Sequence, residues 1–177
     1  MEVLQTPLPG LLLLRPRLIG DHRGAFMEAF NPQAFTQATG WTGQWWQDNH
    51  SWSHAGVLRG LHAQKEPSPQ GKLVRVLQGE IYDVAVDCRH DSPTFGHWHG
   101  FRLSAENRLQ VWLPPGFAHG FLALSAAEVS FKVSAPPDAS ATLAIRWNDP
   151  RLAIDWPLDG ARPILSAADA AAPFWPC

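Results

Sequence analysis

The chain has 177 residues, of which 45% are hydrophobic and 17% charged, and its formal net charge is -2. This length fits one domain, residues 1–177, that can bury a core without metal or disulfide staples. The near balance of charge excludes a strongly basic surface, so neither nucleic acid nor an acidic membrane surface is an expected partner. Cys88 and Cys177 make no disulfide framework, which favours a reducing cytoplasm.

The N-terminal part carries one apolar run, Leu11–Leu14, followed by Arg15 and Arg17. The run is too short to span a bilayer. No basic region precedes it and no small-residue cleavage site follows, so a signal peptide is not expected. Its composition suits a strand that pairs with another strand.

The rest of the chain predicts two short helices and many short strands. Asn31 and Ser166 are typical N-caps and predict helices over 32–39 and 167–172. Aromatic and β-branched runs between Gly and Pro predict strands. These strands cover 56–64, 72–77, 80–87, 98–103, 108–113, 120–124 and 128–133. Short strands at this spacing predict an all-β jelly roll with short helical decoration.

Residues 72–87 have the pattern of a β-hairpin, because the pair Gln78-Gly79 separates two strands as a two-residue turn. Along the second strand, the side chains of Ile81 and Asp83 face one side and that of Tyr82 faces the other. In the preceding strand, Gly60 indicates a bulge or a close approach to another strand.

His62 is the first candidate for chemistry, because Arg59 precedes it and Lys72 follows ten residues later. A histidine with two cations nearby could act as a general base beside an anion site. The structural alternative is a partly buried histidine that only makes hydrogen bonds. His119 follows a Pro-Gly turn and precedes Gly120, and its structural and functional interpretations are equally open.

Two further clusters favour structural interpretations. His97 and His99 share one strand face, as metal ligands would, but no Cys or Glu completes a ligand set, so a solvated strand edge without metal is expected. Arg23 and Glu28 flank Phe26 across a glycine turn. Arg23 could hold a phosphate and Phe26 could stack on a base, but an exposed hairpin is the simpler expectation.

Taken together, six segments resemble the dTDP-4-dehydrorhamnose 3,5-epimerases of the cupin superfamily. The segments are DHRGAFMEAF (21–30), QDNHSWSHAGVLRGLHAQ (47–64), QGKLVRVLQGEIYDVAVDCRHDSPTFGHW (70–98), LPPGFAHGFLALS (113–125), IRWNDPRLAIDWP (145–157) and ILSAAD (164–169). The resemblance implies a cupin-type jelly-roll barrel that acts on a nucleotide-linked 4-keto-6-deoxyhexose without metal or cofactor. It also implies a homodimer in which the N-terminal segment of each subunit reaches the other's site.

The resemblance assigns a role to each candidate residue. The base that removes the hydrogen next to the ketone matches His62, the carboxylate that holds it matches Asp169, and the cation near the keto oxygen matches Lys72. The positions that line the site match Arg59, Gln47, Asn49, His119 and Asp83. The positions that contact the nucleotide match Arg23, Phe26 and Glu28.

One departure from the family changes the expected outcome. The family's tyrosine acid, which returns a proton on the face opposite the base, falls at Phe131, and a second family tyrosine falls at Pro137. Tyr82, the chain's one tyrosine, aligns with a core position that points away from Asp83. The sequence therefore predicts enolate formation with inversion at carbon 3 and weak or no inversion at carbon 5. A ketoisomerase that uses the same enolate and a sugar-nucleotide binding protein without turnover are the alternatives.

Overall fold

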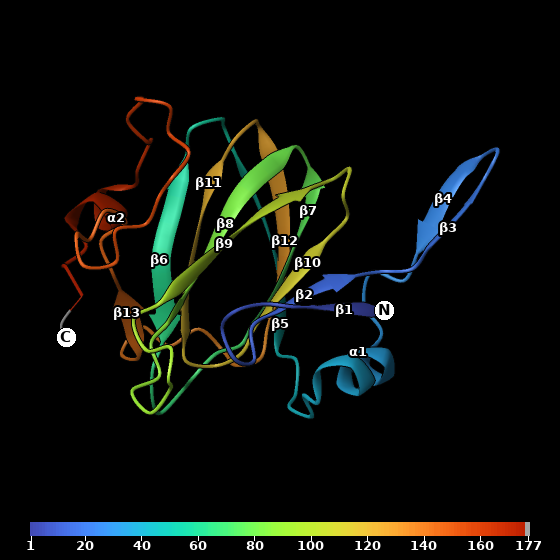
Figure 1. Ribbon diagram of the computed structural model, residues 1–177, viewed down its shortest axis with the longest axis horizontal. Helices are drawn as coiled ribbons and strands as arrows, with labels where there is room; N and C mark the ends of the chain where they lie inside the picture. Colours follow the sequence, from blue (N-terminus) through green and yellow to red (C-terminus); the bar gives the residue numbers. More distant parts are fainter. Residues whose placement is uncertain (176–177) are drawn as a thin grey trace.

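A computed structural model describes residues 1–175; Cys177 lies outside the described residues. Two antiparallel sheets face each other, which confirms the expected all-β jelly roll (Figure 1). One sheet has the order β1 (Glu2–Gln5), β2 (Leu12–Arg15), β10 (Gln110–Leu113), β7 (Lys72–Gln78), β12 (Ala127–Val133) and β5 (Gln47–Ser53). The other has the order β13 (Thr142–Ala144), β6 (Leu58–Gln64), β11 (Phe117–Ala123), β8 (Glu80–Asp87) and β9 (Trp98–Ser104).

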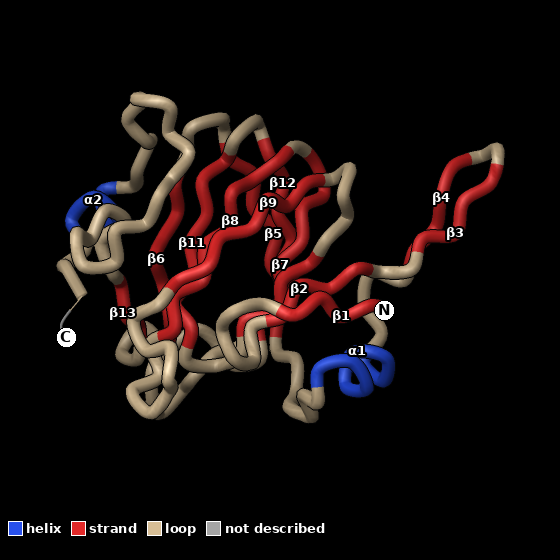
Figure 2. Tube along the Cα trace, viewed as in Figure 1, coloured by secondary structure: helices blue, strands red, loops and turns tan. Residues whose placement is uncertain are grey.

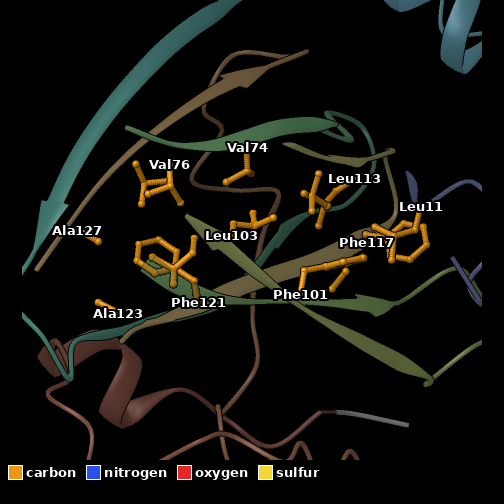
Figure 3. Packing of buried hydrophobic residues seen from close by; sticks show 14 of the residues in the cluster. Leu11, Val74, Val76, Phe101, Leu103, Leu113, Phe117, Phe121, Ala123 and Ala127 are labelled. Atoms are coloured by element: carbon orange, nitrogen blue, oxygen red, sulfur yellow. The ribbon is translucent and has the colours of Figure 1, made fainter. Parts of the chain in front are cut away.

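The main core fills the space between the two sheets. Val74 and Val76 from one sheet lie in the same buried cluster as Phe101 and Phe121 from the other (Figure 3). A second buried cluster covers the outer face of the five-stranded sheet with the C-terminal segment: Leu58, Leu61, Ala63, Val84, Val86, Ala118, Leu122, Ile145, Leu152, Trp156 and Trp175. Both faces of β8 are therefore buried, and its predicted alternation is confirmed.

The predicted hairpin over residues 72–87 is wrong, although both of its strands exist. β7 pairs with β10 and β12, whereas β8 pairs with β11 and β9. Gly79, at φ 74°, carries the chain from one sheet to the other. The apolar faces of both strands contribute to the core between the sheets, and they do so by facing each other across it rather than lying side by side.

Both predicted helices are present, with the predicted caps. Asn31 accepts from the backbone N–H of Ala34 at the start of α1 (Pro32–Thr39). Ser166 accepts from the backbone N–H of Asp169 at the start of α2 (Ala167–Ala171), which ends one residue before the prediction. These caps satisfy N–H groups that have no partner inside the helix. No helix in residues 1–175 has the length and hydropathy needed to cross a membrane.

The N-terminal segment contributes two kinds of strand pairing. The run Leu11–Leu14 overlaps β2, which pairs with β1 and β10 of its own chain. After β2, the strands β3 (Leu18–Asp21) and β4 (Gly24–Met27) form a separate hairpin that projects away from both sheets (Figure 2). Most of its residues are exposed, Phe26 by 65%. The exposed hairpin that the sequence favoured is therefore confirmed.

The edge strand β5 was not predicted from the sequence. Its residues, QDNHSWS, are polar and lack the alternation of apolar side chains that indicates a half-buried strand. β5 nevertheless pairs along its whole length with β12, from Gln47 opposite Val133 to Ser53 opposite Ala127. Ser51, on its inner face, lines a cavity between the two sheets instead of packing in the apolar core, so an apolar side chain is not required there.

Candidate active site

A cavity of about 360 Å³ opens between the two sheets beside α2. The six-stranded sheet supplies one wall, with side chains from β5, β7 and β12. The five-stranded sheet supplies the other, with side chains from β6 and β11. The lining residues are Ser51, Arg59, His62, Lys72, His119, Phe121, Phe131, Ser166, Ala168 and Asp169. The cavity thus gathers all three predicted catalytic residues.

His62 and Asp169 form a hydrogen-bonded pair in this cavity. His62 Nε2 lies 2.7 Å from Asp169 Oδ1, and the other carboxylate oxygen accepts from Ser166 Oγ at 2.7 Å. Asp169 is 6% exposed in its side chain, whereas the imidazole of His62 is 45% exposed. The carboxylate therefore holds the ring in one orientation and favours the tautomer with the proton on Nε2.

The electrostatic surroundings keep His62 neutral near pH 7. Burial lowers the pKa of His62, and the negative charge of Asp169 counteracts only part of this effect. Electrostatic interactions with Lys72 and His119 lower the pKa of His62 further. A neutral imidazole beside a carboxylate is the form that can accept a proton.

Lys72 enters the cavity from β7, on the wall opposite His62. Its Nζ donates to the backbone carbonyl of His62 at 3.2 Å. Burial lowers the pKa of Lys72 to about 8, with the charge of Asp83 acting in the opposite direction. The ammonium is therefore the main form at neutral pH and places a positive charge inside the cavity.

A second histidine–carboxylate pair lies next to the first. His119 Nε2 is 2.7 Å from Asp83 Oδ2, and the two side chains are 11% and 0% exposed. His119 on β11 is directly opposite His62 on β6, so both rings belong to the same wall. Asp83 itself does not line the cavity, and its contact with it is through His119.

Gly60 makes the close approach that the sequence predicted. It has φ 118°, and a Cβ at this position would lie 2.6 Å from the Cα of Gly120. The register between β6 and β11 shifts between His119 and Phe121. The two strands can therefore approach only because glycine is present on both of them.

Phe131 occupies the cavity wall on β12, where the resemblance places a tyrosine. Its ring carries no ionisable hydrogen. Tyr82 does not replace it, because this side chain packs against the cluster on the outer face of the five-stranded sheet. Pro137 is exposed, in the loop after β12, and does not line the cavity.

The remaining predicted residues are divided between the cavity and other places. Arg59 lines the cavity and donates from Nε to Ser53 Oγ at 3.0 Å. Gln47 and Asn49 lie on β5, hydrogen-bonded to each other, and neither lines the His62 cavity. Three other predicted positions lie on or beside the projecting hairpin, on the side of the molecule away from α2: Arg23, Phe26 and Glu28 (Figure 1).

Sequence reasoning missed four residues that line the cavity: Ser51, Phe121, Ser166 and Ala168. For Ser51 a signal was available, because it follows Gln47 and Asn49 at two-residue spacing and so shares their face of a strand. Ser166 was predicted as a helix cap but not as a partner of Asp169.

His97 directly precedes β9 and His99 is its second residue, and β9 is an edge strand as predicted. The ring of His99 packs on Phe101, with centroids 4.7 Å apart. Throughout residues 1–175, no group of three or more His, Cys, Asp or Glu side chains is placed to hold a metal ion.

Comparisons with known proteins show which family this chain resembles. The family model for dTDP-4-dehydrorhamnose 3,5-epimerase matches residues 5–176. The protein of that name from Salmonella typhimurium is 50% identical, over 98% of this chain and 95% of its own length. The crystal structure of dTDP-6-deoxy-D-glucose-3,5-epimerase from Legionella pneumophila, in complex with dTDP-4-keto-L-rhamnose, is 47% identical with a TM-score of 0.93, covering 98% and 92% of the two chains.

A relative whose name specifies epimerisation at a single position has the same fold. The crystal structure of a 3'-monoepimerase from Streptomyces bikiniensis, in complex with dTDP-quinovose, is 35% identical with a TM-score of 0.89, covering 96% of this chain and 85% of that one. The family match over nearly the whole sequence and the identities of about 50% lead to one conclusion: this chain belongs to the dTDP-4-dehydrorhamnose 3,5-epimerase family.

Proposed function

We propose that this protein epimerises a nucleotide-linked 4-keto-6-deoxyhexose by removing a proton next to the ketone. The observation that carries the proposal is the His62–Asp169 pair, 2.7 Å apart, in one cavity with Lys72. The Legionella relative was solved with dTDP-4-keto-L-rhamnose, a sugar of this class. In this proposal residues 1–177 act as one epimerase domain in the cytoplasm, without metal or cofactor.

His62 is the proposed base. A hydrogen on carbon 3 or carbon 5 is acidified by the neighbouring ketone at carbon 4, and a neutral imidazole removes it to give an enolate. Asp169 orients the ring and stabilises the imidazolium that forms, as carboxylates do in other histidine–carboxylate pairs. The 45% exposure of the imidazole allows His62 to release the proton to water afterwards.

Lys72 stabilises the enolate in this proposal. The keto oxygen gains negative charge as the proton leaves, and an ammonium inside a partly water-excluded cavity favours that charge more strongly than water does. Arg59 and the His119–Asp83 pair line the same cavity or support it, and we assign them to the sugar and diphosphate. Gln47 and Asn49 extend this surface along β5.

Phe131 sets the stereochemical outcome. A proton returned by His62 regenerates the original configuration, so inversion needs a donor on the opposite face. Phe131 occupies the tyrosine position on that wall but has no proton to give. We therefore propose that the protein inverts carbon 3, while carbon 5 exchanges its proton with weak or no inversion.

The nucleotide end of the site requires a second copy of the chain. The hairpin that carries Arg23 and Phe26 lies far from its own cavity, and its apolar residues Leu18, Ile19 and Phe26 are 46–65% exposed. In a homodimer each hairpin would reach the partner's cavity, where Arg23 and Glu28 meet the nucleotide. Light scattering at micromolar concentration tests this proposal, and a monomer would contradict it.

The experiment that tests the function is deuterium exchange. Incubation with dTDP-4-keto-6-deoxyglucose in deuterated water, followed by NMR, reports deuterium at carbons 3 and 5 and the configuration of each. Exchange at both carbons with inversion at carbon 3 is the expected result. Movement of the ketone to a neighbouring carbon would instead identify a ketoisomerase.

A second candidate function is sugar-nucleotide binding without turnover, and Phe131 is the observation that favours it. Saturable binding of the nucleotide sugar with no exchange at either carbon would support this candidate and overturn the enzymatic proposal. The complete His62, Asp169 and Lys72 arrangement favours turnover, because binding alone does not require a base held by a carboxylate.

A further inference from the structure

Ser51 lines the cavity, and its hydroxyl takes no part in the proposed removal of the proton. Its Oγ is buried and makes no hydrogen bond within residues 1–175. Three other buried polar atoms in this part of the chain share that property, on Trp41, Asp83 and Gln110, but none of those residues lines the His62 cavity. A buried hydroxyl without a partner is unfavourable, so a group that enters the cavity is the natural partner for Ser51.

The position of Ser51 relative to the base is the second observation. Ser51 lies on β5 of the six-stranded sheet, whereas His62 lies on β6 of the facing sheet. Facing sheets are about 10 Å apart, so a sugar ring fits between the two walls. A group on the wall of Ser51 therefore meets the face of the sugar that His62 does not.

Ser51 is also a neighbour of Phe131. Ser51 is directly opposite Val129 on β12, and Phe131 is two residues farther along the same strand. Such diagonal neighbours share one face of the sheet, and their Cα atoms are roughly 7–8 Å apart. The hydroxyl of Ser51 therefore lies on the wall, and in the neighbourhood, from which the phenol of a tyrosine at position 131 would act.

We propose that Ser51 delivers the proton to the sugar face opposite His62 and so makes inversion possible without a tyrosine. This inference rests on the proposed epimerase function. The O–H bond of Ser51 breaks as a C–H bond forms on the enolate carbon, and Ser51 Oγ takes a proton from a water molecule in the same step. The proton that His62 removed passes to solvent and neutralises the hydroxide, so the enzyme and the proton count are restored.

The other groups in the cavity are less suited to this step. His119 belongs to the same wall as His62, because the two residues are directly opposite each other on β11 and β6. The ammonium of Lys72 donates to the His62 carbonyl, and in the proposed function it holds the enolate oxygen. Phe131 has no acidic hydrogen, which leaves Ser51 as the hydroxyl on the far wall.

The test is the ratio of inversion to exchange in Ser51→Ala. His62 still removes and returns protons, so deuterium exchange is expected to stay within about twofold of wild type. The fraction of exchanged molecules that are inverted is expected to fall at least about tenfold, since a general acid contributes ~10²–10⁴ in rate. Ser51→Thr keeps a hydroxyl on a strand and is expected to retain inversion. Ser130→Ala is the matched control, because Ser130 lines a separate cavity on the outer face of the same sheet.

A double variant makes the inference sharper. Phe131→Tyr in the Ser51→Ala background places a phenol on the same wall and is expected to restore inversion. An unchanged ratio of inversion to exchange in Ser51→Ala would overturn the role of Ser51 but leave the epimerase function intact. Wild-type exchange without inversion at either carbon would also overturn it. Absence of exchange in the wild type would instead overturn the proposed function, so the two failures can be told apart.

Discussion

His62 Nε2 lies 2.7 Å from Asp169 Oδ1, although 107 residues separate the two side chains in the sequence. The contact depends on α2, where the Ser166 cap fixes both the backbone and the carboxylate of Asp169. The carboxylate is therefore already oriented before substrate binds. The proposed base, His62, and its proposed orienting group, Asp169, can therefore be tested separately by mutation.

The first prediction concerns that pair. His62→Ala should abolish deuterium exchange at both carbons, because no other side chain on that wall is free to act as base. Asp169→Asn should slow exchange by ~10²–10⁴, since an amide neither stabilises the imidazolium nor fixes the tautomer. NMR of the substrate in deuterated water measures both rates. His50→Ala is the control, because His50 is exposed and lies 3.2 Å from Glu128, and this variant should exchange at the wild-type rate. Exchange at the wild-type rate in His62→Ala would refute the assignment of His62 as the base.

The second prediction concerns Phe131→Tyr. A phenol at this position can give a proton to the face opposite His62, so inversion at carbon 5 should rise relative to exchange at carbon 5. The configuration of the product, read by NMR coupling constants, measures the change. Phe121→Tyr is the matched control, because Phe121 lines the cavity from the same sheet as His62 and its phenol would be on the wrong face. Full inversion of both carbons by the wild type would show that the proposal of carbon-3 inversion is wrong.

The third prediction is a bell-shaped dependence of kcat/KM on pH. His62 must be neutral to accept a proton, and burial lowers its pKa, so activity should rise with pH through a value below the ordinary 6.5. Lys72 must be charged, and its pKa is about 8, so activity should fall as pH rises through that value. In Lys72→Arg the guanidinium stays charged, and the fall near pH 8 should disappear from whatever activity remains. A fall that persists there would assign the alkaline limb to another group.

The fourth prediction concerns stability. Gly60→Ala should lower the free energy of unfolding by about 1–3 kcal/mol, because the new Cβ would crowd the Gly120 backbone. Gly160→Ala is the control, since Gly160 also has a positive φ but has no atom within 4 Å of an added Cβ. Urea unfolding of the two variants separates the contact from the backbone strain. Equal losses in both would mean that the approach of β6 to β11 does not require glycine.

The fifth prediction concerns metals. Treatment with EDTA followed by buffer exchange should leave the exchange rates unchanged, because the proposed proton transfers use protein side chains and no metal ion. The rates of treated and untreated protein are compared in the same NMR assay. A loss of exchange that added Zn²⁺ restores would contradict this prediction and favour His97 and His99 as metal ligands.

The sequence by itself determined the local features of this protein. Three local features were predicted correctly: the helix caps at Asn31 and Ser166, the alternation along β8, and the close approach of another strand at Gly60. Each depends on a few neighbouring residues. The family resemblance added the residue types of the site. These features can be predicted because hydrogen bonding at a helix end and the two-residue period of a strand are properties of the chain segment itself.

Only the tertiary structure decided how those pieces are combined. Gln78-Gly79 has the chemistry of a hairpin turn, but the strands on either side join different sheets because their apolar faces are buried against each other across the core. The polar strand β5 forms because β12 supplies its hydrogen-bond partners, and it brings Ser51 to the cavity wall facing His62. Burial and long-range pairing select among locally acceptable conformations, and no short window of sequence contains that information.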